Sequence, residues 1–123
     1  MLSKLELQSL IPEDPSSVEN PPSLEIDHFP SVLGRAHECD YRIPNPLVSR
    51  RHCSFVKHDD EIWVCDLGSR NGTRLNGEVV EKEKIIHEGD RIDIGYLPYR
   101  VHVPVASRVA NFLQAVKEGR KSL

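Results

Sequence analysis

Short apolar stretches alternate with turn residues along most of this chain, and the pattern predicts a protein built from β-strands. Runs rich in β-branched and aromatic side chains are separated by Gly, Pro, Asn and Asp. Many closely spaced short strands favour a β-sandwich. The predicted strands are residues 24–29, 31–35, 41–43, 52–58, 61–67, 73–76, 78–80, 84–86, 90–95 and 99–103.

The alternation of apolar and polar residues is strict in the last two predicted strands. A period of two places alternate side chains on one face, which indicates a sheet with one buried side. The residues expected on that buried face are Ile92, Ile94, Tyr99, Val101 and Val103.

Both ends of the chain depart from the strand pattern. Residues 11–23 carry four of the nine prolines together with acidic residues and serines, so we expect residues 1–23 to form a largely flexible N-terminal extension. The globular domain is then predicted at 24–104. In residues 105–123, apolar side chains recur at helical spacing behind a serine N-cap, which predicts an amphipathic helix. This helix could dock on the sandwich or bind a partner.

Composition fits a single globular domain with one or two tails. The chain has 123 residues, of which 38% are hydrophobic and 28% charged. No apolar run approaches the roughly 20 residues that span a bilayer, and the first residues lack the apolar core of a signal peptide. We therefore expect a cytoplasmic location, or a nuclear one if the source is eukaryotic. A net charge of −3 indicates neither nucleic acid nor an anionic membrane as partner.

The three cysteines are widely spaced and form no CxxC motif. Neither a disulfide framework nor a zinc site is indicated, so we expect buried, reduced thiols. A metal site at His37 and Cys39 lacks any recurring ligand spacing. The sequence therefore predicts no metal and no cofactor.

The stretch "DLGSRNGTRLNG" contains two Asn-Gly pairs with different expected roles. Asn76-Gly77 fits a two-residue type I′ hairpin turn. Residues 68–72 form a longer connection, which exposes Ser69, Arg70 and Asn71 between glycines. These side chains are mostly donors and would suit a ligand rich in acceptors, although a plain surface turn explains this loop equally well.

Two further loops favour the ligand interpretation. The loops at 34–37, 44–51 and 68–72 contain four arginines and no acidic residue, although the chain as a whole is acidic. Guanidinium groups, a serine hydroxyl and backbone N–H groups suit an oxyanion of high charge density, of which phosphate fits best. The arginines are Arg35, Arg50, Arg51 and Arg70, and the serine is Ser49.

With these motifs, the sequence resembles a forkhead-associated (FHA) domain. The resemblance rests on "GR", "SRRH", "DLGSRNGTRLNG" and "EGDRIDIG" in that order, and it covers about residues 24–103. It implies an all-β fold, an eleven-stranded sandwich of two twisted sheets whose apical loops bind phosphothreonine peptides. It also implies a binding module that is not an enzyme.

The resemblance further implies roles for individual residues. Arg35, Ser49, Arg50 and Arg70 would contact phosphate, and Asn71 would bind the peptide main chain. His52 would tie the "SRRH" loop to its neighbours. Arg51 would face solvent. Structural support of the site would come from Gly34, His52, Gly68, Ser69, Gly72, Thr73 and Asn76.

Three functional hypotheses follow from the sequence. The first is a module that recognises phosphothreonine on a partner, either a Ser/Thr kinase or a kinase substrate. The second is a phospho-independent scaffold that uses the sandwich face or the C-terminal helix. The third is catalysis by Cys53 beside His52, which is disfavoured because neighbouring strand residues point to opposite faces.

The distribution of threonine bears on where a ligand would come from. Thr73 is the one threonine in the sequence, and residues 1–23 contain none. We therefore expect no self-ligand in the N-terminal tail and a phosphothreonine supplied by another chain.

Overall fold

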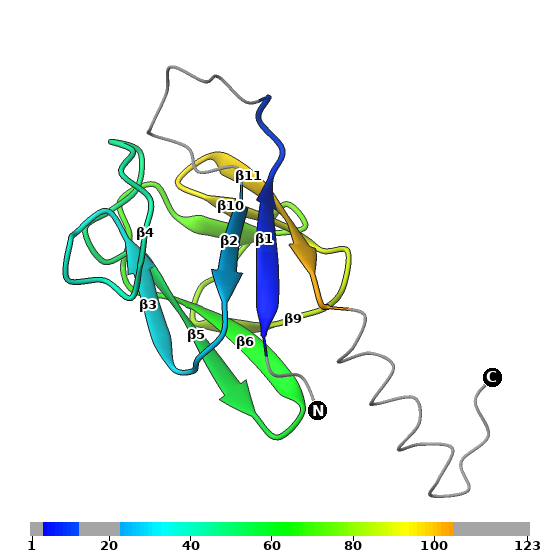
Figure 1. Ribbon diagram of the computed structural model, residues 1–123. Coiled ribbons are helices and arrows are strands. Elements are labelled where there is room, and N and C mark those ends of the chain that lie inside the picture. Colours follow the sequence, from blue (N-terminus) through cyan, green and yellow to red (C-terminus); the bar gives the residue numbers. More distant parts are fainter. Residues whose placement is uncertain (1–3, 13–22, 105–123) are drawn as a thin grey trace, which may run out of the picture.

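Two β-sheets packed face to face make up the described part of the protein (Figure 1). The computed structural model describes residues 4–12 and 23–104. These residues form eleven strands, and no helix within them is long and apolar enough to cross a bilayer. The all-β sandwich is therefore confirmed.

The six-stranded sheet has the spatial order β2-β1-β11-β10-β7-β8, and all of its neighbouring strands pair antiparallel. The five-stranded sheet has the order β4-β3-β5-β6-β9, in which β3 and β4 run parallel. The strands are β1 (Leu5–Ser9), β2 (Ser23–Ile26), β3 (Ser31–Gly34), β4 (Tyr41–Arg42), β5 (Cys53–His58), β6 (Glu61–Asp66), β7 (Thr73–Leu75), β8 (Glu78–Val79), β9 (Glu83–Ile86), β10 (Arg91–Ile94) and β11 (Leu97–His102).

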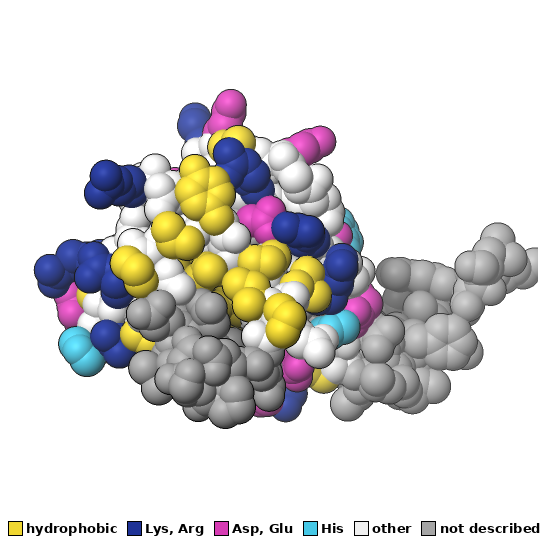
Figure 2. Space-filling view, turned by 90° about the horizontal axis from the view of Figure 1, so that it is seen from above, with side chains coloured by type: hydrophobic (Ala, Val, Ile, Leu, Met, Phe, Trp, Pro, Cys, Tyr) yellow, Lys and Arg dark blue, Asp and Glu magenta, His cyan; other side chains and the backbone are white. Residues whose placement is uncertain are grey.

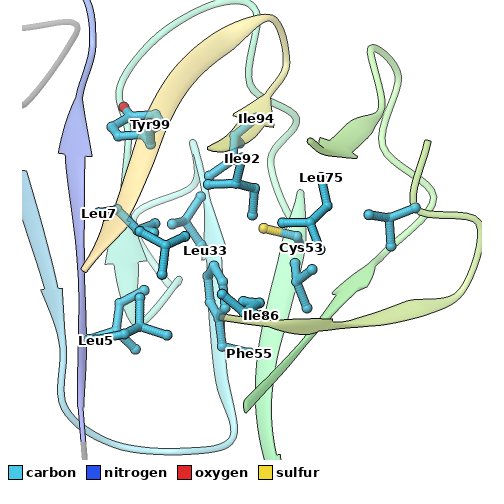
Figure 3. Packing of buried hydrophobic residues seen from close by; sticks show 14 of the residues in the cluster. Leu5, Leu7, Leu33, Cys53, Phe55, Leu75, Ile86, Ile92, Ile94 and Tyr99 are labelled. Atoms are coloured by element: carbon cyan, nitrogen blue, oxygen red, sulfur yellow. The ribbon is translucent and has the colours of Figure 1, made fainter. Parts of the chain in front are cut away.

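The core lies between the sheets and consists mainly of alternate residues of most of the strands (Figure 3). The five residues expected on one face, four of them in β10 and β11 and Val103 directly after β11, are all buried, which confirms the prediction from alternation. The facing sheet contributes Leu33, Cys53, Phe55, Ile62, Val64 and Ile86. Burial of one face in each sheet fixes the strand register, because a slip of one residue would turn the apolar set to solvent.

The N-terminal segment differs from the sequence prediction. Residues 1–23 were expected to be largely flexible, but β1 lies between β2 and β11, in the interior of the six-stranded sheet. Leu5 and Leu7 are fully buried because the alternation in "LEL" matches the inner face. The flexible assignment is therefore wrong for residues 5–9, and the sandwich begins before residue 24.

Other sequence predictions have mixed outcomes. Asn76 and Gly77 have φ angles of 51° and 85° and connect β7 to β8, which confirms the type I′ turn. Of the three free cysteines, Cys53 is buried, whereas Cys39 and Cys65 are only partly buried. The predicted helix in residues 105–123 lies outside the described residues and stays a prediction.

Two close backbone approaches fix the loops at the apex of the sandwich. A side chain on Gly34, the last residue of β3, would collide with the carbonyl oxygen of Arg50. A side chain on Gly95, between β10 and β11, would collide with the carbonyl oxygen of Leu47. Glycine at these positions therefore lets the 44–51 loop lie directly against β3 and against the β10–β11 turn.

Substitution of Leu7 tests whether β1 is an integral strand. Leu7→Ala should lower the free energy of unfolding by about 2–5 kcal/mol, because it leaves a cavity in the core. Glu6→Ala is the matched control, since Glu6 lies on the opposite face of β1 and should change stability by less than about 0.5 kcal/mol. Urea unfolding measures both, and equal effects would contradict the integral strand.

Candidate functional site

The three arginine-bearing loops meet at the apex of the sandwich around one shallow pocket of about 160 Å³. Basic side chains gather at one end of this apical face in the space-filling view (Figure 2). All five residues expected to contact ligand line the pocket, whereas Arg51 does not. The lining residues are Arg35, Pro46, Leu47, Val48, Ser49, Arg50, Arg70 and Asn71.

Ser49 is held by hydrogen bonds through three of its polar groups. Its Oγ accepts a hydrogen bond from the Arg70 N–H at 2.9 Å, and its own N–H donates to Nδ1 of His52 at 3.0 Å. Its carbonyl accepts from the Arg35 N–H at 2.9 Å. Because Oγ acts as an acceptor within the protein, the hydroxyl hydrogen is left to donate to a ligand oxygen.

Arg35 is exposed but its guanidinium is oriented by the neighbouring loop. Nε donates to the carbonyl of Val48 at 3.1 Å. Within the described residues, no carboxylate forms an ion pair with Arg35 or Arg70. The terminal nitrogens of these two side chains are therefore available to an anion in the pocket.

Arg50 offers two different groups to the site. Its guanidinium lies 3.8 Å from Glu38, but both side chains are mostly exposed and such pairs are weak. Its backbone N–H has no acceptor among the described residues. Glu38 follows the 34–37 loop directly, so the region is less purely basic than the loops alone suggested.

Asn71 joins two of the loops and keeps groups free for a ligand. Its Nδ2 donates to the carbonyl of Leu47 at 2.9 Å. One N–H and the Oδ1 acceptor remain, and together they match the donor and acceptor of a peptide main chain.

His52 is completely buried behind the pocket and bridges two loops. Its Nδ1 accepts from the Ser49 N–H, so Nε2 carries the hydrogen and donates to the carbonyl of Gly72 at 2.8 Å. The same carbonyl accepts from the Gly95 N–H at 3.1 Å. Burial lowers the pKa of His52, although the bond to Gly72 and the charge of Asp66 act in the opposite direction. The imidazole is therefore neutral, with its tautomer set by its partners.

Asp66, which the sequence analysis did not single out, organises the 68–72 loop. Its carboxylate accepts from the N–H groups of Gly68 and Ser69, from the Ser69 hydroxyl at 2.6 Å and from the Thr73 hydroxyl at 2.8 Å. Partial burial raises the pKa of Asp66, but these hydrogen bonds together hold it below its usual value. An aspartate two and three residues before the N–H groups that it binds is the sequence signal of such a turn.

The remaining supporting residues have distinct places. Ser69 is turned inward to Asp66 and is not an exposed donor for a ligand, as its loop position first suggested. Thr73 is fully buried. Gly68 and Gly72 have φ angles of 77° and 82°, as expected for this loop. Asn76 lies away from the pocket. Its side-chain Nδ2 donates a hydrogen bond to Asp90, and its Oδ1 accepts one from the Arg91 N–H.

The larger hollows on the surface do not match this site chemically. Grooves of about 440 and 430 Å³ lie beside β8 and β9 and share Glu83 and Lys84. Their charges are of both signs, so they provide no concentrated donor set. Within the described residues, no group of three or more His, Cys, Asp or Glu side chains could hold a metal ion.

Cys53 is unsuited to nucleophilic catalysis. It is fully buried in the core, and burial raises the pKa of its thiol far above the usual value. Its neighbour His52 uses both ring nitrogens in loop contacts. The pair therefore lacks an exposed, activated nucleophile.

Comparison with known sequences finds relatives over about half of the chain. The chain is 39% identical over 72 residues to human proliferation marker protein Ki-67, covering 54% of this chain and 2% of that protein. It is 37% identical over 70 residues to the oxoglutarate dehydrogenase inhibitor of Corynebacterium diphtheriae, covering 57% of this chain and 48% of that protein. The chain thus spans about half of the length of the oxoglutarate dehydrogenase inhibitor and only a small part of the length of Ki-67.

Solved structures share the fold along most of the chain. One comes from a study of phosphothreonine-dependent FHA domain interactions, with a TM-score of 0.66, 27% identity and coverage of 82% of this chain and 97% of that one. The FHA domain of FhaA, in complex with the intracellular domain of another protein, has a TM-score of 0.64 and 28% identity, covering 80% and 99%.

A family model also matches the chain, over residues 31–95, and its description is "FHA domain". This match includes more than half of the chain and all three loops of the pocket. The sequence motifs, the eleven-stranded sandwich and the apical pocket all agree with it. The chain therefore belongs to the FHA domain family of phosphopeptide-binding modules.

Proposed function

We propose that this protein binds phosphothreonine on a partner protein through the apical pocket. The observation that carries the proposal is the convergence of Arg35, Ser49, Arg70 and Asn71 on one pocket, with the Ser49 hydroxyl hydrogen left to donate. The partner would be a Ser/Thr kinase or a substrate of one. The module would then assemble complexes in response to phosphorylation.

Phosphothreonine matches the chemistry of the pocket. It carries a charge of about −1.5 to −2 and three strong acceptor oxygens. Arg35 and Arg70 supply charge, Ser49 supplies a hydroxyl donor, and the N–H of Arg50 lacks another acceptor among the described residues. A carboxylate brings one charge and two oxygens, so Asp or Glu should replace the ligand poorly.

Preference for threonine over serine needs a contact with the γ-methyl group. Burial of one methyl contributes about 0.8 kcal/mol, which is close to fourfold in affinity. The stiffness of a β-branched side chain would add to this by orienting the phosphate before binding. We therefore expect threonine to be preferred.

The phosphothreonine must come from outside residues 1–123. Thr73 is the one threonine in this sequence, and it is fully buried with its hydroxyl bonded to Asp66. It can serve neither as a phosphorylation site nor as a ligand while the sandwich is folded. A separate phosphorylated segment is therefore required.

Titration with a phosphothreonine peptide tests the pocket. Arg35→Ala and Ser49→Ala should each weaken binding at least about tenfold, because each removes a charge-assisted hydrogen bond worth about 1.5–3 kcal/mol. Arg51→Ala is the matched control, since it removes the same charge from a neighbouring exposed residue outside the pocket. It should change the affinity by less than about threefold.

The unphosphorylated peptide separates this function from a phospho-independent scaffold. If it binds as tightly as the phosphorylated form, the domain is a scaffold and the phosphate proposal is wrong. Retention of full affinity in both Arg35→Ala and Ser49→Ala would instead overturn the residue assignments.

The support of Ser49 by a neutral His52 predicts a loss of stability in acid. The pKa of His52 in the folded protein lies below its value of 6.5 when unperturbed. Below about pH 6.5 the unfolded chain binds more protons than the folded one, so the free energy of unfolding decreases as the pH is lowered. His52→Gln cannot titrate, and its stability deficit relative to wild type should shrink between about pH 7.5 and pH 5.

Urea unfolding at each pH measures this difference. His37→Gln controls for the substitution itself, because His37 is exposed and outside the pocket; it should leave stability near pH 7.5 almost unchanged. A deficit of His52→Gln that stays constant over the range would contradict the buried, neutral imidazole.

A further inference from the structure

The outer face of the five-stranded sheet carries a row of large apolar side chains. In β5, β6 and β9, the residues Val56, Trp63 and Ile85 alternate with core residues and therefore point away from the core. The register places Val56 opposite Trp63, and Trp63 opposite Ile85. All three are partly exposed, and we call them the outer apolar row. The outward face of an antiparallel sheet is usually polar, so this row indicates a surface that another element covers.

The row leads into a groove at one edge of the sandwich. Trp63 and Ile85 both line the groove of about 440 Å³ beside β9, which is the edge strand of the five-stranded sheet. Two acidic residues flank the row on the same outer face. Glu61 begins β6, and Glu83 on β9 accepts a hydrogen bond from the Cys65 thiol. The surface thus combines an apolar centre with negative charge at its rim.

The outer face of the six-stranded sheet is different. Along β1, β10 and β11, the residues that alternate with the core are charged or polar apart from one proline. An apolar segment would therefore pack on the five-stranded sheet and not on this one. The outward residues are Glu6, Gln8, Arg91, Asp93, Pro98, Arg100 and His102.

The described chain ends close to the outer apolar row. Val103 directly follows β11, and its N–H donates to the carboxylate of Glu88 at 2.8 Å. Glu88 lies three residues after Ile85, in the connection between β9 and β10. The next four residues, 104–107, span up to about 13 Å when extended. The chain can therefore pass around the β9 edge and reach the outer face.

The sequence that follows has a complementary pattern, although it lies outside the described residues. In residues 105–123, apolar side chains recur at the spacing of one helix face, behind a serine that suits an N-cap. The same segment contains four basic residues and one acidic residue, so its net charge is opposite to that of the rim. The apolar residues are Val109, Phe112, Leu113 and Val116.

We propose that residues 105–123 form an amphipathic helix that packs its apolar face on the outer apolar row. A helix with its side chains is about 10–12 Å wide, and the two strand steps of the row give about 10 Å. A helix over 108–118 is about 16 Å long, close to the length of about 20 Å of a six-residue strand such as β5 or β6. The inference does not depend on the proposed function.

The fluorescence of Trp63 tests this inference in the full chain, because Trp63 is the single tryptophan in the sequence. Phe112→Asn should shift its emission to longer wavelength and increase its quenching by acrylamide, since the largest apolar group of the helix is lost. The melting temperature should fall by at least about 4 °C. Gln114→Asn is the matched control, because it places the same side chain on the opposite face of the predicted helix. It should leave the emission and the melting temperature almost unchanged.

A second substitution tests whether the helix packs on this face. Ile85→Thr keeps a β-branched side chain in β9 and makes the outer apolar row more polar. In that background the fall in melting temperature caused by Phe112→Asn should shrink by about half or more, because residues in contact couple. Val79→Thr is the matched control, since Val79 is 52% exposed on β8, outside the row. It should leave the effect of Phe112→Asn intact.

Three results would overturn the inference. The first is the same Trp63 emission and melting temperature in Phe112→Asn as in Gln114→Asn. The second is an effect of Phe112→Asn that is equal with and without Ile85→Thr, which would place the helix elsewhere. The third comes from sedimentation, which should show a monomer. Self-association that Ile85→Thr abolishes would assign the row to a second copy of this chain.

Discussion

The site depends on one buried imidazole. His52 accepts a hydrogen bond from the Ser49 N–H in one loop and donates one to the Gly72 carbonyl in another, although its own side chain does not line the pocket. A buried histidine with both nitrogens paired fixes the distance between the loops more firmly than exposed contacts could. The Ser49 hydroxyl faces the ligand, and its position, held by a hydrogen bond from the Arg70 N–H, is a consequence of that spacing. The neutral His52 therefore sets the geometry of the loops, and the arginines add positive charge to it.

Much of the fold was predictable because strand patterns are local. The ten strands expected between residues 24 and 103 all have counterparts, and the buried face of β10 and β11 follows directly from alternation. The eleventh strand, β1, was missed because a proline-rich stretch follows it and its burial depends on β11, more than ninety residues away. A short "LEL" alternation is too weak to identify a strand before its partners are known.

The charged and polar ligand contacts of the pocket were predictable, and the family resemblance already pointed to His52 between the loops, but the contacts of Asp66, Gly95 and Ser69 were not predicted. Arg35, Ser49, Arg50, Arg70 and Asn71 all line it, since residue type and loop position are visible in sequence. The Asp66 carboxylate accepts hydrogen bonds from backbone N–H groups and from the inward-turned Ser69 hydroxyl. The Gly95 N–H donates to the carbonyl of Gly72. Such contacts depend on the three-dimensional path of each loop, which residue type alone does not determine.

The position of β1 has a consequence for how the chain folds. Because β1 pairs with β11, the six-stranded sheet cannot close until almost the whole described chain is available. Gln8 and His102 form a hydrogen bond across 94 residues of sequence. Contacts of this range make folding slow compared with locally connected folds, since the loop must be closed before any stabilising contact forms. During synthesis on the ribosome, the five-stranded sheet can form first, and the apex acquires its final shape only when the last strand has emerged.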